Sequence, residues 1–143
     1  MMLAPFDDAY VARNAAAAAY ALGDALQARR AVQDAVGRGE DVYAAVWEDE
    51  EDACYVRIRP SGSLLEPVAS TVCTCAYAEA GWCPHVVAVL LHVRRSPDAL
   101  PSEPPLTATL DALDAGRLRA ILLSLADDDP GLVEQITWLA DPS

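Results

Sequence analysis

Apolar and polar residues alternate in two neighbouring stretches of the chain, DVYAAVWE (41–48) and ACYVRIRP (53–60). A period of two residues is typical of a half-buried β-strand, so both stretches are predicted to be strands. The residues expected on the buried side are Val42, Ala44, Val46, Cys54, Val56 and Ile58. Between the strands, the acidic run EDEED (48–52) indicates a solvated hairpin tip, and a docking patch for a basic partner is the alternative.

A third strand is predicted for LLEPVASTV (64–72). Pro67 has no amide to donate, so this strand is expected at a sheet edge or with a bulge. Further along, PHVVAVLLHVRR (84–95) is apolar over most of its surface and predicts a largely buried helix. Pro84 suits the first position of that helix, because the amide it lacks would have no partner there.

The pattern of apolar residues before position 41 does not distinguish helix from strand throughout. An N-terminal helix is expected, with Asp7 or Asp8 as its cap and Gly23 near its end. The following stretch, residues 24–36, fits a helix by propensity, but residues 31–36 also fit a short strand. Both alternatives remain open at this point.

The C-terminal part of the chain has a different character. Residues 97–105 are rich in proline and are predicted to be a linker. Residues 106–143 contain three short amphipathic segments with leucine at helical spacing, and they predict an α-helical region. Asp129 and Pro130 are placed as the N-cap and first residue of the last helix.

Composition narrows the class of protein. The 143 residues carry a formal net charge of -12, and all ten basic residues are arginine. An acidic chain is repelled by phosphate, which argues against unaided binding to duplex DNA. No apolar run is long enough to span a bilayer, and the N-terminus does not resemble a secretory signal, so a cytoplasmic protein without membrane contact is expected.

The candidate chemistry lies in CTCAYAEAGWCPH (73–85), which holds three of the four cysteines and one of the two histidines. Cys73 and Cys75 are two apart at a predicted strand end, so their side chains point to the same face. Cys83 precedes Pro84 and is therefore pushed out of the helical region, while His85 falls in the first helical turn. Two converging Cys/His pairs are the ligands that Zn²⁺ prefers in a tetrahedral site.

Other uses of the cluster explain fewer of its residues. A disulfide leaves His85 without a role, a nucleophilic Cys–His pair leaves Cys73 and Cys75 without one, and iron–sulfur clusters normally take four cysteines. Cys54 is interpreted as a small buried hydrophobe. His92 is about 10 Å along the helix from His85, too far to share its metal, and is expected to be partly buried or on the surface.

Cys-x-Cys followed by Cys-x-His at the start of an apolar helix resembles the SWIM-type zinc finger, and the chain looks like a stand-alone prokaryotic member. The resemblance covers roughly residues 5–95 and favours the strand alternative for residues 31–36. It implies an α+β fold with an N-terminal helix, a small antiparallel sheet and a ββα-type zinc finger. Pro84 departs from the family, whose members often carry lysine there.

By this resemblance, Cys73, Cys75, Cys83 and His85 are the four ligands of one structural Zn²⁺. The expected organisation is a zinc-finger domain over residues 1–96 and an α-helical tail after the linker. Family members are inferred to bind DNA or proteins.

A site filled by four protein ligands has no open position for a substrate, so no enzyme activity and no small-molecule substrate are expected. The expected function is that of an interaction or adaptor module in a regulatory or nucleic-acid-related complex. A protein partner is favoured, direct DNA or RNA binding is the alternative, and homo-oligomerisation is left open. The residues proposed for a partner or nucleic-acid surface are Arg57, Arg59, Arg94 and Arg95.

Overall fold

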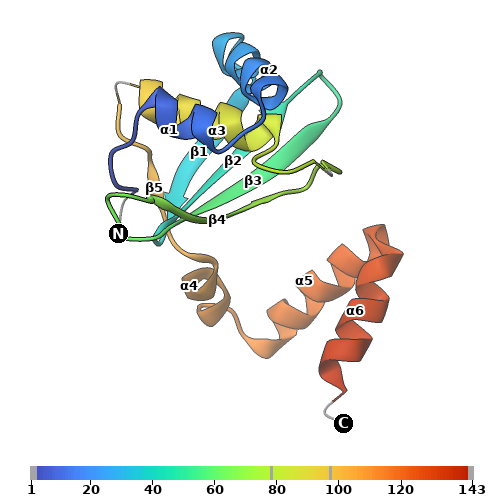
Figure 1. The fold of residues 1–143 in the computed structure, drawn as a ribbon. Helices are drawn as coiled ribbons and strands as arrows, with labels where there is room; N and C mark the ends of the chain where they lie inside the picture. Colours follow the sequence, from blue (N-terminus) through green and yellow to red (C-terminus); the bar gives the residue numbers. More distant parts are fainter. Residues whose placement is uncertain (1–2, 78, 97, 142–143) are drawn as a thin grey trace. The chain divides into compact units, whose positions relative to one another are not determined.

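The chain is described by a computed structural model that covers residues 3–77, 79–96 and 98–141. Residues 1, 97 and 143, which bound the predicted segments, lie outside these ranges. The chain divides into two compact units, Met1–Glu103 and Pro104–Ser143. The fold class is α+β, as predicted (Figure 1).

The first unit is built on a five-stranded sheet with the order β4-β3-β2-β1-β5. Its strands are β1 (Val32–Arg38), β2 (Asp41–Trp47), β3 (Ala53–Pro60), β4 (Val68–Cys73) and β5 (Ser102–Glu103). The first four strands pair antiparallel, but β5 runs parallel to β1, so the sheet is mixed rather than wholly antiparallel. The Gly37 amide donates to the Pro101 carbonyl at 2.8 Å, which fastens the proline-rich segment to the sheet edge.

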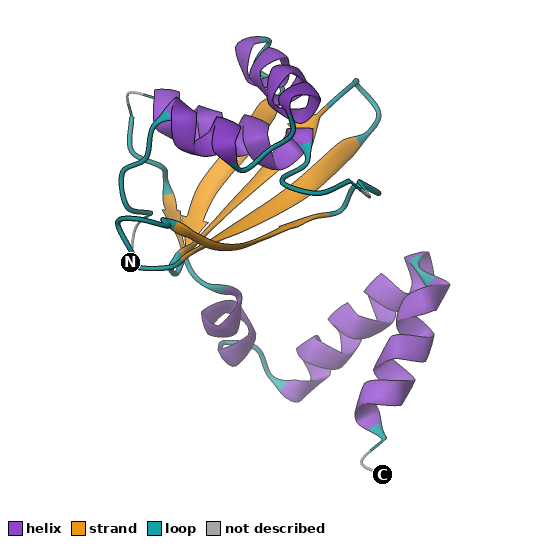
Figure 2. Cartoon of the chain, viewed as in Figure 1, coloured by secondary structure: helices purple, strands orange, loops and turns teal. Residues whose placement is uncertain are grey.

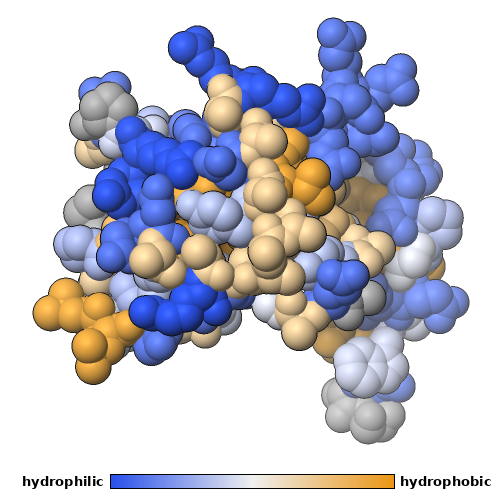
Figure 3. Space-filling view, turned by 45° about the horizontal axis from the view of Figure 1, so that its top comes forward, coloured by the Kyte–Doolittle hydropathy of each residue, from blue (hydrophilic) through white to orange (hydrophobic). Residues whose placement is uncertain are grey.

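Three helices, α1 (Asp8–Arg13), α2 (Ala17–Ala28) and α3 (Pro84–Arg95), lie on one face of this sheet (Figure 2). α3 is the central core element, because every residue from His85 to Leu91 is buried. The inward-facing strand residues that complete the core are Val42, Ala44, Val46, Val56 and Ile58. The apolar core therefore lies between α3 and the sheet. On the surface, Figure 3 shows hydrophilic side chains bordering a band of weakly hydrophobic ones.

The N-terminal region differs from the single helix expected there. Asp7 caps α1, since its Oδ1 accepts the Tyr10 amide at 2.8 Å, but the helix ends at Arg13 with Asn14 as its C-cap. A second helix, α2, then runs through Gly23 and ends before Arg30, whose φ of 61° turns the chain into β1. The ambiguous stretch 24–36 is thus helix first and strand afterwards.

Strand β4 begins at Val68, four residues later than predicted. Before it, the Ser63 hydroxyl accepts the amides of Leu65 and Glu66, and this local turn removes residues 64–66 from the sheet. A register irregularity does occur at the Pro60 end of the β3–β4 pair. β4 is an edge strand, as the proline predicted.

The second unit contains α4 (Leu106–Asp111), α5 (Ala115–Asp128) and α6 (Pro130–Ala140). Asp129 caps α6 as predicted, because its carboxylate accepts the Gly131 amide at 3.0 Å. The division between the units falls after Glu103, inside the segment 97–105 that was interpreted as a linker. Among the described residues, no helix has the length and apolar character that crossing a membrane requires.

Candidate metal centre

The four residues singled out in the sequence converge at the start of α3. Cys73 is the last residue of β4, Cys83 is the N-cap of α3, and His85 lies in the first turn. One ligand atom from each of these residues and from Cys75 lies within 4.8 Å of all the others. The His85 Nδ1 is 3.7 Å from the Cys73 sulfur and 3.9 Å from the Cys83 sulfur.

These separations fit a tetrahedral metal. A sulfur at about 2.3 Å and a nitrogen at about 2.0 Å from one Zn²⁺ ion are roughly 3.5 Å apart. Three sulfurs and one imidazole nitrogen are a preferred donor set for zinc. The residues present therefore form a metal-binding group, and its chemistry is consistent with a structural zinc.

Local backbone geometry explains how Cys83 and His85 converge although they are two residues apart. Cys83 has extended dihedrals (φ -71°, ψ 164°) in front of Pro84, and its sulfur accepts the Val86 amide at 3.5 Å. The loop before it turns at Gly81, whose φ is 87°. The Trp82 amide then donates to the Asn14 carbonyl at 3.0 Å, which ties the loop to the end of α1.

Electrostatics favour a thiolate at the helix start. The pKa of Cys83 is lowered to about 4, first by the hydrogen bond with Cys73 and then by the His85 ring and the Val86 amide, against the opposing effect of burial. The same contact with Cys83 raises the pKa of Cys73, and burial adds to the increase. The pKa of His85 is raised to about 9, first by the hydrogen bond with Cys83. Negative charge is therefore concentrated at the Cys83 sulfur, at the positive end of the α3 dipole.

Glu48 is a site residue that the sequence analysis missed. Its Oε1 lies 2.5 Å from the Nε2 of His85, on the side of the ring opposite the cysteines. A carboxylate in this place fixes the ring orientation of a metal-ligating histidine and increases its basicity. In the sequence, Glu48 ends the predicted strand 41–48 and begins the acidic hairpin tip, and no local signal separates it from its acidic neighbours.

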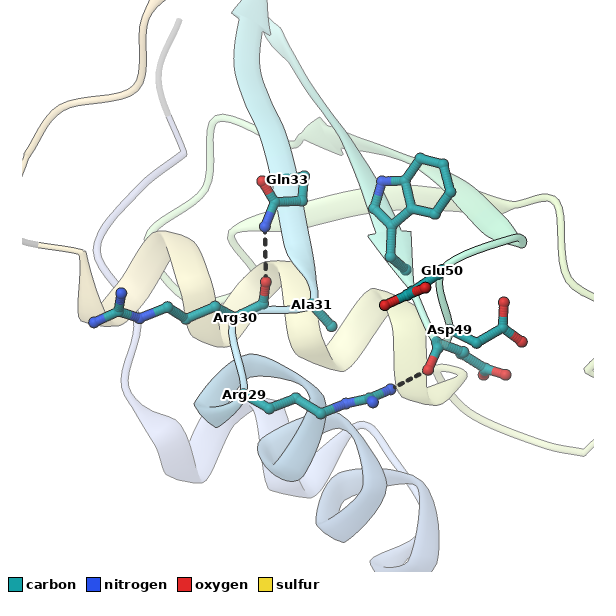
Figure 4. A pocket seen from close by; sticks show the side chains of 8 residues that line it. Arg29, Arg30, Ala31, Gln33, Asp49 and Glu50 are labelled. Carbon is teal, nitrogen blue, oxygen red and sulfur yellow. Dashed lines mark hydrogen bonds between the residues drawn. The ribbon is translucent and has the colours of Figure 1, made fainter.

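Arg29 holds the backbone that carries Glu48. Its guanidinium donates to the Glu48 carbonyl at 2.6 Å, and Figure 4 shows the side chain reaching from the end of α2 toward the loop of Asp49 and Glu50. This loop borders an open pocket of about 510 Å³. The arrangement connects α2, the β2–β3 turn and the metal ligand His85.

The remaining cysteine and histidine also have defined places. Cys54 is half-buried rather than buried, and Cys73 and Cys75 lie close enough to affect the pKa of its thiol. Burial raises the pKa of the Cys54 thiol, and the charge of Cys75 raises it further. All four cysteines of the chain therefore lie near one another, although Cys54 is not in the metal-binding group. His92 is half-buried in α3, and its pKa is lowered by burial.

The four arginines proposed as a partner surface do not form one patch. Arg57 and Arg59 alternate on β3 with the buried Val56 and Ile58, so they point to the sheet face away from the core. Arg94 and Arg95 end α3, which lies on the core side of the sheet (Figure 1). Carboxylates pair with three of them. The ion pairs are Arg59–Asp41 at 3.1 Å, Arg94–Asp8 at 4.0 Å, Arg95–Asp8 at 3.1 Å and Arg95–Asp24 at 2.6 Å. The Nε of Arg57 is buried without a hydrogen-bond partner among the described residues.

Searches of protein-family models, curated proteins and solved structures found no match to this chain. A Cys₃His group alone does not establish a family.

Proposed function

We propose that the first unit is a SWIM-type, zinc-stabilised interaction module, without enzymatic activity, that acts as an adaptor for a protein partner in the cytoplasm. The observation that carries this proposal is the composition of the metal-binding group. Cys73, Cys75, Cys83 and His85 supply four ligands, which fill a tetrahedral zinc shell and leave no position for substrate or water. A filled site stabilises the fold and leaves recognition to the surface.

The surface that we assign to the partner is the sheet face opposite the helices. Register places Tyr43, Arg57 and Val72 side by side in one row across β2, β3 and β4. Next to this row, Tyr55 is 61% exposed, and Val72 itself is 49% exposed. Exposed aromatic and apolar side chains grouped with an arginine are characteristic of protein-binding surfaces.

The charge arrangement supports a protein partner over nucleic acid. Three of the four arginines first considered for phosphate contacts are already paired with carboxylates, so neutralising phosphate would require breaking those pairs. Of these four arginines, Arg57 is the one with no carboxylate ion pair among the described residues.

The experiment is an affinity purification of zinc-loaded protein from an extract of its own cells, with mass spectrometry and with or without nuclease. Wild type is compared with a Tyr55→Ala, Val72→Ser variant of the open face. Leu22→Ser is the matched control, because Leu22 is 58% exposed on α2, on the other side of the sheet. We expect a nuclease-resistant partner that binds wild type and the control but not the open-face variant. Capture that nuclease abolishes would contradict a protein partner.

Direct binding of nucleic acid is the second candidate function. The feature that favours it is the same sheet face, since Tyr55 can stack on an unpaired base while Arg57 contacts phosphate. Affinity for single-stranded and duplex oligonucleotides would be measured at low ionic strength, where the phosphate contribution is strongest. Binding that Tyr55→Ala weakens, with a marked salt dependence, would favour this function over the adaptor.

A further inference from the structure

The fourth cysteine of the chain lies against the metal-binding group without belonging to it. Cys54 is half-buried on β3, and its thiol is hydrogen-bonded with the side chain of Cys73. The metal-binding group engages the other three cysteines and His85. Of the four cysteines in the chain, Cys54 is therefore the one that keeps its sulfhydryl when a metal fills the site. It holds that sulfhydryl next to metal-ligating sulfurs.

Strand register places Cys54 directly opposite Cys75. The β3–β4 ladder continues past Cys73, because the Thr74 amide donates to the Tyr55 carbonyl at 3.1 Å. The next pair along the ladder is Cys54 and Cys75. Pairs of this non-hydrogen-bonded kind have Cα atoms about 4.5 Å apart and side chains on the same face. A disulfide takes a Cα separation of about 4.4–6.8 Å, so these two cysteines are in register for one.

A small oxidant has access to the cysteines at the end of β4. Cys73 and Cys75 are half-buried, whereas Cys83 is only 6% exposed. An open pocket of about 160 Å³ is lined by all three ligand cysteines, together with Thr71 and Trp82. Oxidation of cysteine follows thiolate character and exposure, and a second thiol beside the oxidised one captures it as a disulfide. Cys75 has both the exposure and the neighbouring thiol.

We propose that Cys54 and Cys75 form an oxidation site, at which a hydroperoxide converts the two sulfurs to a disulfide. The Cys75 thiolate attacks one peroxide oxygen, the O–O bond breaks, hydroxide leaves, and the sulfur becomes a sulfenic acid. The Cys54 thiol then attacks the sulfenic sulfur, the S–S bond forms, and the displaced hydroxyl leaves with the thiol proton as water. One thiolate, one thiol and one hydrogen peroxide thus give one disulfide, one hydroxide and one water.

The disulfide removes one of the four donors from the metal-binding group. A tetrahedral zinc shell that loses the Cys75 sulfur is incomplete, so the metal is released. β3 and β4 are already paired, so the new bond leaves the sheet intact. A dithiol reduces the disulfide by exchange and restores both thiols, and disulfides in reducing compartments are usually of this transient, redox-sensing kind. The release of zinc rests on the function proposed above, whereas the pairing of Cys54 with Cys75 does not.

The test treats the full zinc-loaded chain with limiting hydrogen peroxide. A chromogenic chelator measures the zinc released, and tandem mass spectrometry after alkylation under denaturing conditions maps the disulfide. Wild type is expected to release one zinc for each Cys54–Cys75 disulfide formed. Dithiothreitol and added zinc should then restore the loaded protein.

Cys54→Ser is the variant that separates this site from general oxidation of the ligands, because it keeps all four of them. It should bind zinc as wild type does, but peroxide should carry its ligand sulfurs on to sulfinic acid, so zinc binding is not recovered with dithiothreitol. Adding Ala53→Cys to this variant is the matched control. Residue 53 is one position earlier on β3 and faces the other side of the sheet, so its thiol should not rescue recovery.

A main disulfide that joins any other pair of cysteines would overturn the proposal. So would recovery of zinc binding in Cys54→Ser equal to that of wild type. Because the map is made on wild type, it decides the pairing even if a variant fails to fold. Wild type isolated without zinc would contradict the proposed function, and its disulfide map would still decide the pairing.

Discussion

Glu48 contacts His85 across 37 positions of sequence, with 2.5 Å between the carboxylate oxygen and Nε2. The other ring nitrogen, Nδ1, faces the sulfurs of Cys73 and Cys83. The carboxylate and the cysteines therefore contact different nitrogens of the same imidazole ring. This relationship makes Glu48 a positioning residue for the metal-binding group.

Replacing Glu48 with glutamine should weaken zinc binding by about 10- to 100-fold, the range found when such carboxylate partners are removed. Competition with a fluorescent chelator measures the change. Glu50→Gln is the matched control, because Glu50 belongs to the same acidic run and lines the pocket, and it should leave zinc affinity unchanged. Equal losses in both variants would attribute the effect to general surface charge.

Cys83→Ser should abolish zinc binding and unfold the first unit, because the binding free energy of a structural zinc is part of the folding free energy. Metal analysis and circular dichroism give the two readouts. Cys54→Ser tests whether proximity alone matters, since Cys54 lies beside Cys73 and Cys75 but outside the metal-binding group. It should retain one zinc per chain. Wild type that is isolated without zinc and stays folded with a chelator would contradict the structural role.

Gly23→Ala should destabilise the first unit although alanine is the better helix former. A Cβ at position 23 would lie 2.5 Å from the Cγ1 of Val87 and 2.7 Å from the Pro84 carbonyl. Overpacking of this kind costs about 1–3 kcal/mol. The shift would be measured as a lower urea midpoint. Gly116→Ala is the comparison, because its nearest atom is Asp114 Oδ1 at 3.4 Å, and no loss is expected there.

Arg95→Met should lower the free energy of unfolding by up to about 1 kcal/mol at low salt, and by less at high salt. Arg95 contacts Asp8, Asp24 and Gln27, so it fastens the end of α3 to α1 and α2. Arg94→Met provides a matched comparison, because its ion pair with Asp8 is longer, at 4.0 Å. A smaller loss is expected for it. A salt-independent loss for Arg95→Met would assign the effect to packing of the side chain.

Elements with a strong local signal could be predicted closely. The alternation in β2 and β3 and the Pro84 start of α3 depend on neighbours within one turn or strand, and the structure places all three within a residue of the prediction. The spacing of Cys73, Cys75, Cys83 and His85 likewise identified a metal-binding group. The break after α1 and the late start of β4 were missed, because they depend on the hydrogen bonds of Asn14 and Ser63.

The sequence by itself determined which residues meet at the start of α3, because strand periodicity and the proline act over a few positions. Only the tertiary structure decided what surrounds them. Strand pairing brings Glu48 to His85. Gly23 has no side chain, so Val87 can pack closely against α2. Ser102–Glu103 pairs with β1 at the sheet edge. These contacts link residues far apart in the chain, and their geometry exists only after the sheet and helices have packed together.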